Sequence, residues 1–325
     1  MEQSQEREEL TLVARKPCFD LPTACPICLP VYIYLKLARI PFTLEFNSIY
    51  PDSDQIPYVE YGAYVAYNNE NDGVIERLKH DGVVDLDSEF QSVPEWLSAK
   101  AMISSWLANA ITYELWLGSD ASVAYKIYYS DLPWPIRKFL FLKQLYSVKQ
   151  RLGITKDNAQ WREEQIYKRA KMAYDALSTR LGEQDFLFEN RPSHLDALFL
   201  GHALFTLQAL PETSVLRSKL LEHDNIVRYA GKLKMEFLEA NSSSSAPQPH
   251  SFPSSSAPRR QTSNWSSKPK SKPKREKTEE EKKFKWRSKY FLAAQGLAVL
   301  LFLSVMGYGS AEVELEGDDE GFNYD

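Results

Sequence analysis

Two cysteines separated by two residues are the part of this 325-residue sequence best suited to chemistry. Cys25 and Cys28, in the run Cys-Pro-Ile-Cys, stand directly before an apolar stretch that predicts a helix. A CxxC pair at a helix start can lower the pKa of one thiol and support thiol–disulfide exchange. The alternative is that two small buried residues start the helix, with Pro30 beside them, and we favour this second interpretation.

The other reactive side chains do not form a recognisable site. Cys18 is the only further thiol, so no second pair exists for a metal, and three cysteines fit a reducing compartment. None of the five histidines has metal-ligand spacing, and we expect His194 and His202, on one predicted helix, to pack or cap. No Gly-rich phosphate loop and no nucleophile elbow occurs. The sequence therefore predicts no cofactor and no metal.

An α/β unit must position the two cysteines. The pattern predicts strands over 9–14, 42–47, 56–60 and 63–67 and helices over 29–40 and 74–79. The order β-α-β-β-β-α indicates a mixed sheet.

Helical periodicity replaces the strand pattern from Pro94 onward. It predicts helices over 94–116, 161–181, 195–210, 215–221 and 225–238. The segment 195–210 is apolar on all faces, so it should be a central buried helix. Ser193 and Asp196 stand at its start with the spacing of a capping box, with Asp in the fourth place.

The C-terminal third has a different composition. Residues 241–274 contain 12 Ser and 6 Pro, which cannot bury a core, and we expect a disordered linker there. Residues 290–308 are 19 uncharged, mostly apolar residues with a tyrosine at each end, enough for a helix of ~28 Å that spans a bilayer.

The charge distribution orients this expected membrane helix. Residues 268–289 carry 11 Lys and Arg, whereas 309–325 carry none, and this bias places the N-terminal side in the cytosol. With no signal peptide expected at the N-terminus, we predict a single-pass tail anchor. The linker lysines favour anionic membrane lipid as a partner, and we expect no nucleic-acid partner, because they lie directly before the membrane.

An α/β half followed by a helical half resembles the glutathione-transferase architecture. Pro57 precedes a strand, as the cis-proline of that family does, and Ser193-x-x-Asp196 is similar to its N-capping box. The expected fold is therefore α/β plus all-α and glutathione-transferase-like. It comprises a thioredoxin-like domain over 1–88, a helical domain over 92–238, a linker over 240–289, a transmembrane helix over 290–308 and an acidic tail over 309–325.

A closer resemblance is to the metaxins, transferase-like membrane proteins of mitochondrial import, with a plant-type member favoured. The residues that carry it are 32–42, 114–117 with 125–140, and 191–202. The resemblance implies a non-enzymatic protein of the mitochondrial outer membrane that faces the cytosol. It implies three kinds of partner: the outer-membrane β-barrel insertase, other sorting and assembly subunits, and mitochondrial precursor proteins. The folded part of the chain would be a docking domain that holds a precursor or a partner subunit.

Two alternatives remain beside this interpretation. The first is a membrane-tethered glutathione transferase or thiol oxidoreductase that uses Cys25 and Cys28. It is weakened because transferases hold glutathione with an acidic residue followed by Ser, and here Glu70 is followed by Asn71. The second is the same adaptor placed on the chloroplast envelope or the endoplasmic reticulum.

An aromatic group in the metaxin-like stretch has two interpretations as well. Its members are Trp116, Tyr125, Tyr128, Tyr129 and Trp134. We favour a packed core with a helical bend at the neighbouring prolines. The functional alternative is an exposed apolar patch that receives an extended precursor or a partner, with Trp116 and Trp134 as recognition candidates.

Overall fold

The computed structural model describes residues 9–47, 53–70, 72–90, 92–118, 121–134, 136–188, 191–239 and the single residue 295. The expected linker, the acidic tail and all but one residue of the expected membrane helix over 290–308 lie outside these residues. Within the described part, no helix is both long and apolar enough to cross a bilayer.

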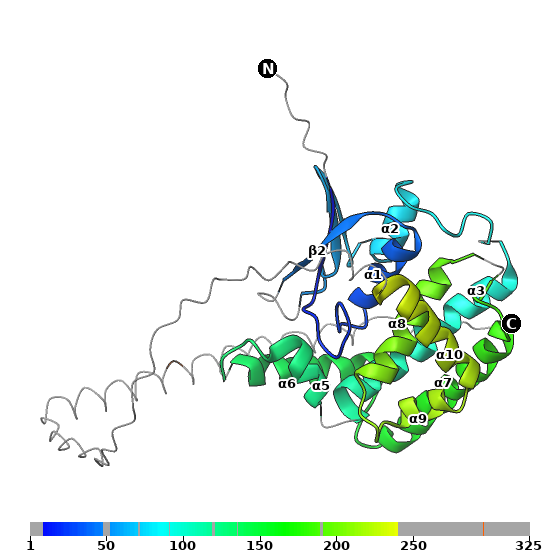
Figure 1. Cartoon of the computed structure of the whole chain (residues 1–325). Coiled ribbons are helices and arrows are strands. Elements are labelled where there is room, and N and C mark those ends of the chain that lie inside the picture. The colour runs from blue at the N-terminus through cyan, green and yellow to red at the C-terminus, as the bar shows by residue number, and fades with distance from the viewer. Residues whose placement is uncertain are drawn as a thin grey trace, which may run out of the picture. The chain divides into compact units, whose positions relative to one another are not determined.

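The N-terminal half is a four-stranded sheet with two helices (Figure 1). The elements are β1 (Leu10–Ala14), α1 (Cys28–Leu37), β2 (Phe42–Phe46), β3 (Tyr58–Tyr61), β4 (Tyr64–Tyr67) and α2 (Val74–His80). The strand order is β2-β1-β3-β4, with β1 and β2 parallel and the other two pairs antiparallel. This confirms the mixed sheet and the β-α-β-β-β-α order that the sequence predicts.

The C-terminal half is entirely helical among the described residues. Its elements are α3 (Pro94–Ala101), η1 (Met102–Leu107), α4 (Ala108–Tyr113), η2 (Glu114–Gly118), α5 (Ser122–Ala124), η3 (Tyr125–Tyr129), α6 (Ile136–Arg151), α7 (Ala159–Leu181), α8 (His194–Gln208), α9 (Val215–Leu221), α10 (Asp224–Leu233) and η4 (Lys234–Glu239). The η elements are π-helical turns, so the single helix predicted over 94–116 is in fact interrupted twice. The periodicity did not predict α6.

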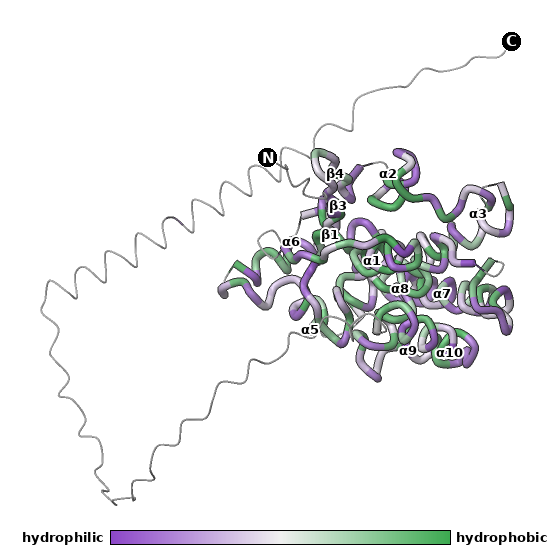
Figure 2. The backbone as a smooth tube through the Cα atoms, turned by 45° about the horizontal axis from the view of Figure 1, so that its top comes forward, coloured by the Kyte–Doolittle hydropathy of each residue, from purple (hydrophilic) through white to green (hydrophobic). Residues whose placement is uncertain are grey.

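The helices α1 and α8 form the centre of the folded unit, and both are coloured mainly hydrophobic in Figure 2. They pack directly on one another across the two halves. Gly201 marks the closest approach, because a Cβ there would lie 2.8 Å from Cγ of Pro30. The prediction that the segment 195–210 is a central buried helix is confirmed.

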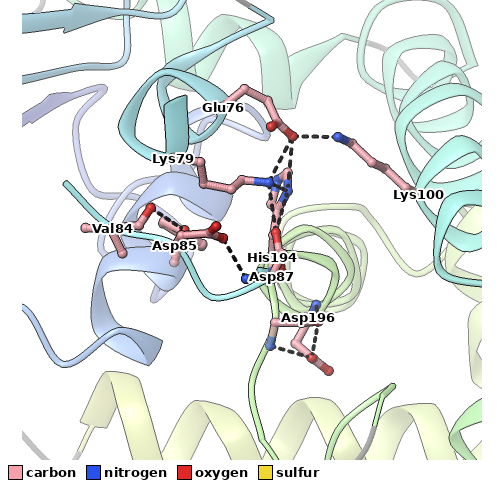
Figure 3. Close-up of polar contacts among 10 residues, drawn as sticks. Glu76, Lys79, Val84, Asp85, Asp87, Lys100, His194 and Asp196 are labelled. Carbon is pink, nitrogen blue, oxygen red and sulfur yellow. Dashed lines mark hydrogen bonds and ion pairs between the residues drawn. The ribbon is translucent and has the colours of Figure 1, made fainter. Parts of the chain in front are cut away.

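A buried ionic network also joins the two halves (Figure 3). Lys79 Nζ on α2 lies 2.8 Å from Asp87 Oδ2 and 3.1 Å from Glu76 Oε1. The other carboxylate oxygen of Asp87 accepts a hydrogen bond of 2.8 Å from the backbone N–H of His194, the first residue of α8. The loop after α2 therefore helps to cap the central helix of the other half. The domain boundaries themselves, 1–88 and 92–238, stay predictions.

Candidate functional site: the cavity between the two halves

A cavity of about 710 Å³ lies between the sheet half and the helical half. Its volume falls within the range of small-molecule and cofactor sites. The walls come from the start of α1, from the loop before β3, and from η1, α4, α6 and α8. Among the lining residues are Arg15, Cys25, Ile56, Asn68, Ser104, Asn109, Trp116, Tyr128, Gln144, Ser147, Arg151 and His202.

The two cysteines of the CxxC motif meet this cavity in different ways. Cys25 lines it, with only 3% of its surface exposed, whereas Cys28 is fully buried at the first position of α1. The hydroxyl of Tyr128, on η3 of the helical half, lies 3.4 Å from Cys25 Sγ. The motif therefore places one thiol at a cavity wall, where a residue 103 positions away can hydrogen-bond to it.

The surroundings of the two thiols shift their pKa values in opposite directions. Burial acts to raise the pKa of Cys25, but hydrogen bonds from Cys28, Tyr128 and the backbone outweigh it and lower the pKa to about 6. The pKa of Cys28 is raised well above its ordinary value by burial and by the neighbouring Cys25. A thiol with a pKa near 6 is mainly thiolate at neutral pH, and the thiolate is the nucleophilic form.

The loop that carries Pro57 contributes to the cavity wall. The Ile56–Pro57 peptide bond is cis, and Ile56 itself is a lining residue. Next to this loop, the buried Arg15 donates a hydrogen bond of 3.2 Å to the Ser53 carbonyl. The same guanidinium lies 5.8 Å from the centre of the Tyr128 ring. The position of Pro57 fits the transferase resemblance, and its role in recognition stays a prediction.

Most of the aromatic group is a packed wall of the cavity. Trp116 is 7% exposed and stacks on Tyr128 with ring centres 5.5 Å apart. Phe141 on α6 completes the group, 4.4 Å from the ring centre of Tyr125. Trp134 does not belong to this packed group, because it is 65% exposed and lies after the loop that leaves η3. Its role as a recognition residue stays a prediction. For the other members, the favoured interpretation as packed core is confirmed.

The Ser193 and Asp196 pair lies at the start of α8 and does not line the cavity. Both halves of the capping box are present. Asp196 also accepts hydrogen bonds from the backbone N–H of Leu187 at 2.8 Å and from the hydroxyl of Tyr229 at 3.0 Å. The carboxylate therefore ties the preceding loop and α10 to the central helix.

The sequence did not place three polar residues, Arg15, Tyr128 and His202, in the wall of the cavity. Tyr128 lies 103 positions after Cys25, and only the fold brings the two together. Arg15 precedes Cys25 by ten positions, but no motif links it to the cysteines. His202 was expected to pack, and it also lines the cavity while its Nε2 lies 2.6 Å from the Tyr174 hydroxyl. Burial lowers the pKa of His202 to about 3, so this ring is neutral. Within the described ranges, no three His, Cys, Asp or Glu side chains are grouped to bind a metal ion.

Comparison with known proteins identifies the fold. The family model "Glutathione S-transferase N-terminal domain" matches residues 26–121, and the model "Glutathione S-transferase, C-terminal domain" matches residues 170–233. A solved structure, the β-etherase LigF from Sphingobium, aligns over 71% of this chain and 99% of its own length, with 12% identity and a TM-score of 0.49. The two family models confirm the glutathione-transferase-like fold with a thioredoxin-like sheet and a helical C-terminal domain.

Comparison with curated proteins identifies the family as well as the fold. The chain is 67% identical over 320 residues to "Mitochondrial outer membrane import complex protein METAXIN" of Arabidopsis thaliana, covering 98% of this chain and 99% of that protein. The chain belongs to the metaxin family. Human metaxin-2 is 24% identical, with 65% of this chain and 81% of that relative covered. The Arabidopsis relative fits the expected plant-type member of the family.

The cavity of this metaxin offers two kinds of interaction. Cys25 and Tyr128 form a small thiol site in its wall. Elsewhere the walls combine apolar surface with amide, hydroxyl and guanidinium groups, including Asn109, Ser104 and Arg151. Such a mixture can hold a small polar ligand or a short segment of polypeptide, whose backbone needs both donors and acceptors.

Proposed function

We propose that this metaxin is a non-enzymatic subunit of the mitochondrial outer-membrane machinery for protein import and β-barrel sorting and assembly. The observation that carries the proposal is the 67% identity, over 98% of the chain, to a protein named for an import complex of that membrane. Residues 290–308 would anchor the chain in the outer membrane as a single span, and the folded unit would face the cytosol.

The folded unit would serve as a docking domain for a precursor or a partner subunit, such as the β-barrel insertase. The cavity between the halves supports this role, because its walls offer hydrogen-bonding groups and apolar surface at a size suited to a short extended segment. Its polar lining does not need catalysis to be useful, since peptide recognition depends on paired backbone groups and filled pockets.

A pull-down from solubilised mitochondrial outer membranes tests this proposal. The full chain should recover the β-barrel insertase, and Ser104→Trp, which fills the cavity wall, should reduce the recovery. Ser98→Trp is the matched control, because Ser98 is an exposed serine one to two turns earlier and does not line the cavity. Consistent absence of the insertase from wild-type pull-downs would contradict the adaptor role.

A separate experiment tests in which membrane the chain is located. A fluorescent fusion that carries only residues 268–325 should localise to the mitochondrial outer membrane if this segment is the anchor. Targeting of the fusion to the chloroplast envelope or the endoplasmic reticulum would instead favour the same adaptor on another membrane.

A second candidate function is a membrane-tethered glutathione transferase or thiol oxidoreductase. The observation in its favour is the Cys25 thiol at the cavity wall, with its pKa lowered to about 6. Binding to immobilised glutathione, combined with a conjugation assay, separates the two functions. Retention together with turnover that is lost in the Cys25→Ser, Cys28→Ser double variant would replace the adaptor proposal. No turnover in the wild-type chain would support the adaptor.

A further inference from the structure

The outer side of α6, together with Trp134 two residues before it, carries an unusual concentration of exposed apolar residues. Of the 15 large hydrophobic side chains that are exposed in the described part of the chain, five fall between positions 134 and 146. We call these five the apolar ridge: Trp134, Ile136, Phe139, Leu142 and Tyr146, which are 52–67% exposed. Scattered exposed apolar residues are normal, but a contiguous group indicates an interaction site.

The ridge and the packed side of α6 lie on different faces of the helix. Phe139, Leu142 and Tyr146 are three and four residues apart, a spacing that places them on one face. Phe141 and Val148, which are buried, occupy the other face and pack toward the body. The helix contacts η2 and η3 through that buried face, and it lies at the edge of the folded unit in Figure 1. The ridge therefore faces away from the protein.

The charge of α6 decides what kind of surface the ridge suits. The helix contains five Lys and Arg and no acidic residue. Lys138 lies one turn before Leu142, and Lys149 lies three residues after Tyr146, so these exposed lysines border the ridge. Apolar and aromatic residues flanked by lysines are typical of helices that lie in a membrane interface, where the lysines reach the anionic headgroups.

We propose that the apolar ridge docks into the headgroup region of an anionic phospholipid bilayer. A second copy of the chain fits this face less well, because a two-fold contact would bring the same cations of α6 against themselves without a carboxylate on either helix. An exposed tryptophan and tyrosine at the two ends of the ridge suit a headgroup layer, since their rings combine apolar and polar character.

This inference goes beyond the proposed function. It rests on that function only in requiring that the chain is held close to a membrane. The expected span over 290–308 would hold the chain at a bilayer, but the length of chain between position 239 and that span leaves open which face meets it. The ridge would add a second attachment that defines the orientation of the folded unit.

Site-specific photocrosslinking tests the proposal with the full chain reconstituted in vesicles. A benzophenone amino acid would replace Phe139 in one variant and Tyr146 in another. The matched control carries it at Trp161, an aromatic residue on α7 that is 57% exposed. Phosphatidylcholine vesicles with and without phosphatidylglycerol would be compared, and lipid adducts would be measured by mass spectrometry.

Adducts are expected at positions 139 and 146 and not at 161, with higher yield in the anionic vesicles. Lys138→Gln and Lys149→Gln should each lower the docked fraction by about fivefold, because one lysine near an anionic surface contributes on that scale. Added salt should act in the same direction.

Equal adduct yields at positions 139 and 161, or no adducts, would overturn the proposal, and so would a crosslinked dimer of the chain in place of lipid adducts. Flotation of the same vesicles after an alkaline wash reports separately on the anchor. A chain that floats without ridge adducts would contradict the ridge alone, whereas adducts on a chain that the wash removes would contradict only the anchor.

Discussion

Asp87→Ala should weaken the junction between the two halves strongly. The Asp87 carboxylate is fully buried, and its two nearest partners are the Lys79 ammonium at 2.8 Å and the first N–H of α8 at 2.8 Å. Removing one member of a buried ion pair costs about 3–5 kcal/mol, and an unsatisfied buried N–H costs about 1–3 kcal/mol. Because Lys79 keeps its contact with Glu76 at 3.1 Å, we expect the loss in free energy of unfolding to lie near the lower end of the sum, at about 4 kcal/mol.

Urea unfolding of the purified chain in detergent, followed by circular dichroism, measures this loss. Asp87→Asn should cost less, about 2 kcal/mol, because the amide oxygen can still accept from the α8 N–H while the charge pairing is lost. Asp131→Ala is the matched control. Its carboxylate also pairs across the two halves, with Lys16 at 2.7 Å, but it is 54% exposed. Exposed pairs contribute less than about 1 kcal/mol. Equal losses for Asp87→Ala and Asp131→Ala would refute the reasoning from burial.

Three further changes follow from the packing and the cavity. Gly201→Ala should destabilise the chain by about 1–3 kcal/mol in the same unfolding assay, because the new Cβ meets Pro30. Tyr128→Phe should raise the pKa of Cys25 by about 1–2 units, because a hydrogen bond to a charged group contributes about 1.5–3 kcal/mol. The pH dependence of alkylation by iodoacetamide measures this pKa. Between pH 7 and pH 5 the buried His202 should cost about 2 kcal/mol of stability, a loss that His202→Gln should remove.

The sign of the His202 effect follows from its lowered pKa. The folded state keeps the ring neutral down to about pH 3, whereas the unfolded chain takes up a proton below its ordinary value of 6.5. Stability is therefore present above pH 6.5 and falls as the pH drops toward 3. An unfolding midpoint equally sensitive to pH in His202→Gln would contradict this assignment. For the other two variants, an unchanged alkylation profile in Tyr128→Phe or wild-type stability in Gly201→Ala would do the same.

Local and periodic features were predictable from the sequence. The capping box at Ser193 depends on residues three positions apart, so its spacing is visible in the chain. The strands and the central helix show their burial through alternation or through an unbroken apolar run. These signals were enough to predict a mixed sheet with the element order β-α-β-β-β-α and a helical second half. Together with the metaxin-like stretches, they also predicted the family.

Contacts between distant segments were not predictable in this way. The Cys25–Tyr128 contact joins residues 103 positions apart, and only the packing of η3 against the start of α1 creates it. The helix α6 was missed because its apolar residues lie on two opposed faces, one packed and one exposed, which hides a single amphipathic stripe. The same ambiguity led to the inclusion of Trp134 in the packed aromatic group, since a sequence shows an aromatic residue but not its exposure.

The two faces of α6 connect the cavity with the proposed membrane contact. Gln144, Ser147 and Arg151 line the cavity, whereas Phe139 and Tyr146 belong to the ridge. A helix held on a bilayer by its outer face would present its inner face, and with it one wall of the cavity, in a fixed orientation to the membrane. Partners embedded in the same membrane would then meet the cavity from a defined side, which reduces the orientational search that association requires. The lysine variants that weaken the ridge leave the cavity wall intact, so any effect they have on insertase recovery measures this coupling directly.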